Sequence, residues 1–70
     1  MTANEALDQY LSSLSPKERN AKSRDIRAYC RISSSVLYDW RCGRTRIPWF
    51  LRDKITEALG LDIFESSQND

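Results

Sequence analysis

The side chains best suited to chemistry gather in one short stretch in the middle of this chain. Three consecutive serines, Ser33–Ser35, are followed by Tyr38 and Asp39. Their hydroxyl and carboxylate groups form hydrogen bonds. Leu37 and Trp40 are three residues apart and would share another face of the same helix. A helix with one apolar face and one small, hydrogen-bonding face suits a structure that lies in a DNA groove.

The two cysteines, Cys30 and Cys42, are the other reactive side chains, and the chain has no histidine. Two cysteines without histidine are too few for a Cys/His zinc site, and no phosphate-loop pattern is present. Arg41 and Arg44 would favour a thiolate at Cys42, but a thiol enzyme also needs a base and a cleft. We therefore expect two reduced thiols, no catalytic or metal site, no cofactor and no small-molecule substrate.

The length of 70 residues allows one small domain, predicted over residues 1–65 and followed by a disordered polar tail at 66–70. No apolar run approaches the ~20 residues of a membrane span. No apolar segment of a secretory signal stands near the N-terminus, so we expect a cytoplasmic protein.

Charge is unevenly distributed along the chain. All eleven Lys and Arg fall between Lys17 and Lys54, together with only four acids, a balance of +7. The remaining six acids stand near the two ends. A basic middle predicts a surface that meets an anion, although a solvated mixture of charges is the equally simple alternative.

Four helical segments would position these groups. Thr2 and Glu5 form a capping box for a helix over about 3–14, whose apolar stripe is Leu7, Tyr10, Leu11 and Leu14. Ser15 and Pro16 predict a second start. We expect a short turn there, and a new start between Asn20 and Ser23 for a helix that ends near Cys30. Its inner face would be Ile26, Tyr29 and Cys30, and its first turn would offer a phosphate site at Lys22, Ser23 and Arg24.

The second half begins with a turn at residues 31–32. Ser33 would cap a helix over about 34–42, and Gly43 would end it in a left-handed conformation. After a basic loop at 44–46, Pro48 would open a helix over about 48–59 that Gly60 ends. The apolar stripe of this last helix is Leu51, Ile55, Ala58 and Leu59, and a last apolar turn follows at Leu61, Ile63 and Phe64.

The order of these residues resembles a known family. An Ile-Ser pair, then Leu37, Trp40 and Gly43 at fixed spacing, then basic residues and an Ile-Pro pair, resembles the phage repressor/Cro type of helix-turn-helix protein (XRE, lambda-repressor-like) over about residues 22–64. The resemblance implies an all-α, compact four- to five-helix bundle. It also implies double-stranded DNA as the partner, with the helix at about 34–42 in the major groove, and a transcriptional regulator that usually acts as a dimer.

The resemblance also assigns roles to positions. It implies base-facing roles for Ser34, Ser35, Tyr38 and Asp39. It implies DNA-backbone roles for Lys22, Ser23, Ser33, Arg44, Thr45 and Arg46. Trp40 matches an inner position, where aromatic rings pack. Serine discriminates weakly between bases and Asp39 is as well suited to a structural role, so modest direct readout is expected.

Two positions depart from the family pattern. Arg31 stands where glycine is usual, and would hold an unusual backbone angle at a cost of about 1 kcal/mol. Arg27 stands where alanine is usual, so either its stem lies along the helix pair or the two helices are spaced differently.

Two further hypotheses stay open. Exposed Trp49, Phe50 and Phe64 would favour a protein-interaction module, antitoxin-like or accessory, with the same fold and little DNA specificity. The apolar end at Leu61, Ile63 and Phe64 is a candidate homodimer surface, the alternative being that its side chains close the bundle against the first helix.

Overall fold

Four helices make up residues 2–64, the part of the chain that this computed structural model describes. They are α1 (Ala3–Ser12), α2 (Pro16–Cys30), α3 (Ser34–Cys42) and α4 (Trp49–Leu59), and no strand occurs within that range. The all-α prediction is confirmed. The tail at 66–70, predicted to be disordered, lies outside the described residues.

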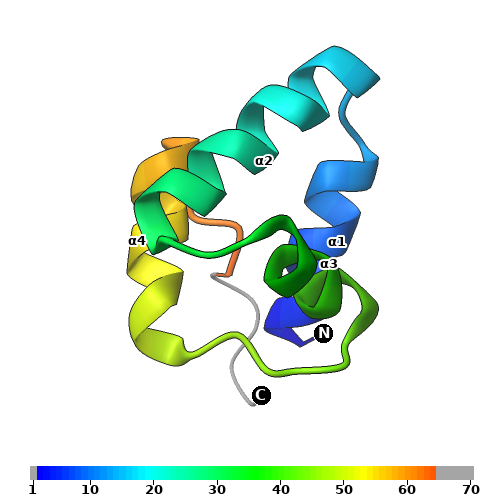
Figure 1. Cartoon of the computed structure of the whole chain (residues 1–70). Coiled ribbons are helices and arrows are strands. Elements are labelled where there is room, and N and C mark those ends of the chain that lie inside the picture. The colour runs from blue at the N-terminus through cyan, green and yellow to red at the C-terminus, as the bar shows by residue number, and fades with distance from the viewer. Residues whose placement is uncertain (1, 65–70) are drawn as a thin grey trace.

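The helices pack in two pairs. α4 packs against α2, and α3 packs against α1. Figure 1 shows α2 running across the top from the right to the left, α4 at the left beneath its end, α1 and α3 towards the right, and the loop from α3 to α4 along the bottom. The core lies between the pairs, and its most deeply buried large side chains are Leu7, Leu11, Ile26, Ile47 and Ile55.

The predicted helix caps are present. Thr2, Ser15 and Ser33 each accept a hydrogen bond from the backbone N–H three residues later, which satisfies one of the free donors of a first turn. Gly43 (φ 77°) and Gly60 (φ 74°) follow α3 and α4 in the left-handed conformation that glycine adopts without steric cost. These local signals position α3 as the sequence predicted.

The predicted interruption of the second helix is wrong. α2 begins at Pro16 and continues to Cys30 without a new start between Asn20 and Ser23. Glu18 and Lys22 are four apart in the favourable order, and the first half of α2 contributes nothing to the buried core, so it needs no apolar stripe. The N–H groups near Ser23 therefore lie in mid-helix, and the predicted phosphate site at a helix N-terminus there is wrong.

Smaller corrections concern element ends and one inward-facing residue. α1 ends at Ser12, two residues earlier than predicted, and Pro48 precedes α4 instead of forming its first residue. Tyr29, predicted on the inner face of α2, is 50% exposed. Ile26 and Cys30 already fill that inner face, so the Tyr29 ring lies at the surface.

Candidate nucleic-acid interface

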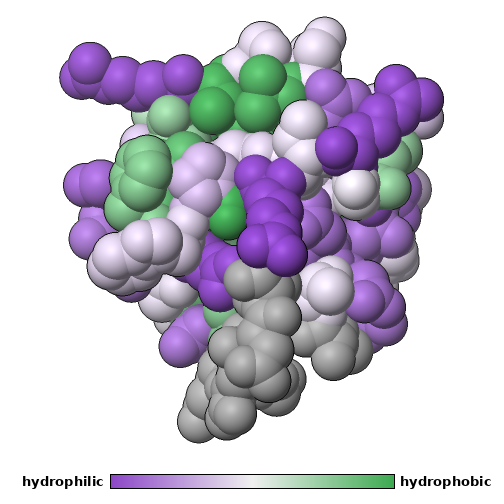
Figure 2. Space-filling model, turned by 90° about the horizontal axis from the view of Figure 1, so that it is seen from below, coloured by the Kyte–Doolittle hydropathy of each residue, from purple (hydrophilic) through white to green (hydrophobic). Residues whose placement is uncertain are grey.

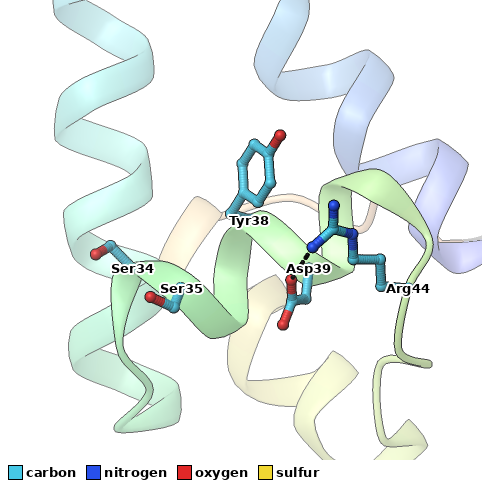
Figure 3. Close-up of a pocket in the computed structure, with 5 residues that line it drawn as sticks. All are labelled: Ser34, Ser35, Tyr38, Asp39 and Arg44. Atoms are coloured by element: carbon cyan, nitrogen blue, oxygen red, sulfur yellow. Dashed lines mark ion pairs between the residues drawn. The ribbon is translucent and has the colours of Figure 1, made fainter.

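The side of α3 that faces away from α1 is exposed and polar. Ser34, Ser35 and Tyr38 are exposed, Asp39 is half-buried, and with Arg44 they line an open hollow of about 560 Å³. Figure 3 shows that Tyr38 and Asp39 point in different directions, so the side chains spread over the helix instead of converging on one point. The structure thus brings together the four residues predicted to face bases, on a surface suited to contact with an extended partner.

The opposite side of α3 completes the core. Leu37 is 4% exposed and Trp40 is 3% exposed. The prediction that Trp40 packs inside is confirmed. Because the fold uses only this side of the helix, the outer polar side is left available.

Arg44 is loosely held beside the exposed side of α3. Its guanidinium Nη1 lies 3.9 Å from Asp39 Oδ1, and its side chain is 70% exposed. Its guanidinium carbon also lies 6.0 Å from the centre of the Tyr38 ring. Exposed ion pairs contribute little stability, so Arg44 can turn outward to an anion at small cost.

The Tyr38 hydroxyl is influenced by Cys42, one turn further along α3. The neighbouring Cys42 side chain raises the pKa of Tyr38, and the positive charge of Arg44 opposes the shift. A tyrosine hydroxyl is protonated at neutral pH in any case, and this shift is in the same direction, so Tyr38 is able to donate a hydrogen bond.

The loop that carries Arg44 and Arg46 is fixed by a residue of α1. Asn4 Nδ2 donates to the backbone oxygens of Trp40 and Thr45, both at 2.7 Å. The buried side chain of Ile47 anchors the far end of the same loop. Sequence reasoning missed Asn4, because its partners lie 36 and 41 residues away and no local pattern marks such a contact.

Two of the basic residues hold the fold together. Arg19 donates to the backbone oxygens of Leu11 (2.9 Å) and Leu14 (3.0 Å), near the end of α1. Arg41 Nε lies 2.8 Å from Asp8 Oδ1, which ties α3 to α1. The positive charge of the middle segment is therefore only partly available to a partner.

The predicted backbone-contact residues form two groups. Thr45 and Arg46 are exposed in the loop with Arg44, and Ser33 is exposed at the start of α3. Lys22 and Ser23 are half-buried on α2, and only Ser23 lines the hollow of about 210 Å³ between α2 and α3.

That hollow between α2 and α3 also bears on the second departure from the family pattern, Arg27. Arg27 is half-buried and lines the hollow together with Ser34 and Leu37. This placement agrees with a stem that lies along the helix pair, the first of the two alternatives.

The candidate dimer residues after α4 are mostly used inside the molecule. Phe64 is 8% exposed and Ile63 packs against the core, while Leu61 is 46% exposed. Their packing follows the alternative in which this segment closes the bundle. Of the three aromatic residues predicted to be exposed, Phe64 is therefore buried, whereas Trp49 (74% exposed) and Phe50 (63% exposed) lie at the surface.

The described residues also bear on other classes of site. Within residues 2–64, no three Cys, Asp, Glu or His side chains are grouped so that they could hold a metal ion. No helix in that range is long and apolar enough to cross a membrane. Comparison with known proteins found no matching family model, no similar curated protein and no similar solved structure.

Proposed function

We propose that this protein is a small, non-enzymatic DNA-binding regulator that lays α3 in the major groove of double-stranded DNA. Phosphate contacts from the 44–46 loop would position it, and the outer side of α3 would contact base edges. In this proposal α2, the turn at 31–33 and α3 form a helix-turn-helix of the phage repressor/Cro type.

One observation carries the proposal: α3 has a polar outer side that the fold does not use, next to a fixed loop with exposed arginines. Ser34, Ser35 and Tyr38 lie on that outer side, and Arg44 and Arg46 lie in the loop. An α-helix with side chains is about 10–12 Å wide and the major groove is about 12 Å wide. Lys and Arg beside an inserted helix are the groups that bind phosphates.

The turn before α3 supplies further support. Arg31 has φ 55° and ψ 50°, a left-handed conformation. That is the conformation for which the family uses glycine at this position, so the departure lies in the side chain and the backbone geometry agrees with the family.

The residues on the outer side of α3 predict that the protein discriminates only weakly between DNA sequences. Serine hydroxyls contact several bases without distinguishing them strongly, and the Asp39 carboxylate repels nearby phosphates. Most of the binding free energy would therefore come from phosphate contacts, which position a protein without specifying a sequence.

The proposal is tested by fluorescence anisotropy with a labelled random-sequence duplex at about 50 mM salt. We expect Arg44→Ala with Arg46→Ala to weaken binding to every sequence alike. The control is Lys17→Ala with Lys54→Ala, which removes the same charge from α2 and α4. The proposal fails if the two double variants lose affinity equally, or if the wild-type protein does not bind.

A second candidate function is a protein-interaction module with the same fold. The exposure of Trp49 and Phe50, adjacent on the first turn of α4, favours it, because aromatic side chains are enriched at interfaces. Retention of the protein on DNA that disappears as salt rises would separate the two functions in favour of DNA binding.

The DNA-binding proposal includes a homodimer in which two copies contact each other through the segment after α4 that contains Leu61. Helix-turn-helix proteins of this type usually read two half-sites about one DNA turn apart. Leu61 is the one strongly exposed member of the candidate dimer residues, so Leu61→Asp is the variant to use. Sedimentation should show a wild-type dimer on a two-half-site duplex and a Leu61→Asp monomer. A wild-type monomer there would eliminate pairing.

A further inference from the structure

A second surface lies on the α2–α4 pair, separate from the outer side of α3. A hollow of about 710 Å³ lies between the last turn of α2 and the first two turns of α4. Its lining includes Tyr29, Cys30, Arg31, Phe50, Leu51 and Lys54. Cys30 is buried and its thiol donates to the Leu51 backbone oxygen at 3.9 Å, so the two helices meet beneath the hollow.

The hollow has apolar walls with no covering element among the described residues. Tyr29 is 50% exposed and Phe50 is 63% exposed. Trp49, the sequence neighbour of Phe50, is 74% exposed but does not line the hollow. Figure 2, seen from below, shows hydrophobic groups at the surface between strongly hydrophilic ones. Exposed aromatic rings at the edge of a hollow are typical of sites that take an apolar side chain of a partner.

The charge of the hollow is of one sign. Arg31 and Lys54 are exposed at its edge, and no acidic residue lines it. Within residues 2–64 the Arg31 side chain makes no hydrogen bond or ion pair. An occupant that presents carboxylates would complement these two cations.

The arginine side chain at position 31 is a further feature of this hollow. α3 and α4 each end on a left-handed glycine, whereas α2 ends on Arg31 with φ 55°, the only left-handed non-glycine residue in the described part of the chain. An arginine is strained where a glycine is not, so the fold alone would favour glycine here. Strain that the fold does not need is a feature of functional positions.

We propose that this hollow binds a short acidic segment of a partner protein, with an apolar side chain against Tyr29 and Phe50 and carboxylates on Arg31 and Lys54. The apolar lining favours a peptide over a nucleic-acid backbone, whose phosphates would find only two cations. This inference develops the second candidate function. It can be tested separately from the DNA-binding proposal, because none of the residues that line this hollow is one of the predicted DNA-contact residues.

The test follows backbone amide shifts in the full-length, nitrogen-15-labelled protein as three probes are added. The probes are the peptide Asp-Glu-Leu-Phe-Asp-Glu, its uncharged counterpart Asn-Gln-Leu-Phe-Asn-Gln, and a single-stranded hexathymidylate. We expect the acidic peptide to shift the amides of Tyr29, Arg31, Phe50 and Lys54, and to bind roughly tenfold more tightly than the uncharged one.

Matched variants separate the hollow from general charge attraction. Arg31→Gly with Lys54→Gln should weaken the acidic peptide roughly tenfold while the protein stays folded, since glycine suits this backbone angle. Lys17→Gln with Arg24→Gln removes the same charge from α2 outside the hollow and should leave binding unchanged. The proposal is overturned if the acidic peptide does not shift these amides, if both peptides bind equally, if the two double variants behave alike, or if only the oligonucleotide shifts the amides.

Discussion

Replacement of Asn4 by alanine should destabilise the protein far more than its partly exposed position suggests. Asn4 Nδ2 donates to the Trp40 and Thr45 oxygens, both at 2.7 Å, and so links α1 to the end of α3 and to the loop. Each such bond contributes about 1 kcal/mol net, with more lost where a carbonyl group is left without a partner. The better helix propensity of alanine offsets roughly 0.5 kcal/mol. The expected loss in the free energy of unfolding is therefore about 2 kcal/mol.

Thermal unfolding followed by circular dichroism measures this loss. For a domain of this size about 2 kcal/mol lowers Tm by roughly 8–16 °C. Gln9→Ala, which removes an exposed amide from the same helix, should change stability by less than about 0.5 kcal/mol. Asn4→Asp keeps the shape but turns the donor into an acceptor, so it should be at least as damaging as Asn4→Ala. Equal Tm values for the Asn4→Ala and Gln9→Ala variants would refute the claim that Asn4 fixes the loop.

Further predictions concern helix ends and thiols. Gly43→Val should lower the free energy of unfolding by about 1–2 kcal/mol through backbone strain alone, since a Cβ there meets nothing within 4 Å. Gly43→Asn should cost less, and equal Tm values for the two variants and the wild type would contradict this. Arg31→Gly should raise stability by about 1 kcal/mol in the same assay, and a lower Tm would contradict the strain at φ 55°. A thiol reagent should modify exposed Cys42 quickly and buried Cys30 slowly, because burial raises the pKa of Cys30 despite the opposing charge of Lys54; equal rates would contradict the difference in burial. Because the folded protein holds the Cys30 proton more tightly than the unfolded chain, the free energy of unfolding should be unaffected below pH 9.0 and should fall as pH rises above it. Denaturant titrations at pH 8 and pH 10 can check this.

Local chemistry made much of the fold predictable. The caps at Thr2, Ser15 and Ser33, and the glycines at Gly43 and Gly60, act within one turn of their own helix, so the sequence reveals them directly. The outward side of α3 was predictable for the same reason, because the spacing of Leu37 and Trp40 determines which side of the helix is buried. The base-facing roles on that side came from the family resemblance and stay a prediction.

Contacts between distant parts of the chain could not be predicted in this way. Asn4, Arg19 and Arg41 find partners on other helices or loops, and nothing in their neighbourhoods distinguishes them from solvated polar residues. The polar first half of α2 was predicted to be interrupted because hydrophobic periodicity detects only helices that pack on a core. The packing of Phe64 likewise depended on space left by the other helices.

The most direct test of the central claim is the salt dependence of duplex DNA binding by the wild-type protein. If about 4–6 phosphates are contacted, the logarithm of the binding constant should fall with the logarithm of salt concentration at a slope of about −4 to −5. Loss of Arg44 and Arg46 should reduce the magnitude of that slope by about 2, one phosphate contact for each arginine. A binding constant that does not change with salt, or a slope that the loop variant leaves unchanged, would contradict the proposal that this loop and α3 form a DNA-binding surface.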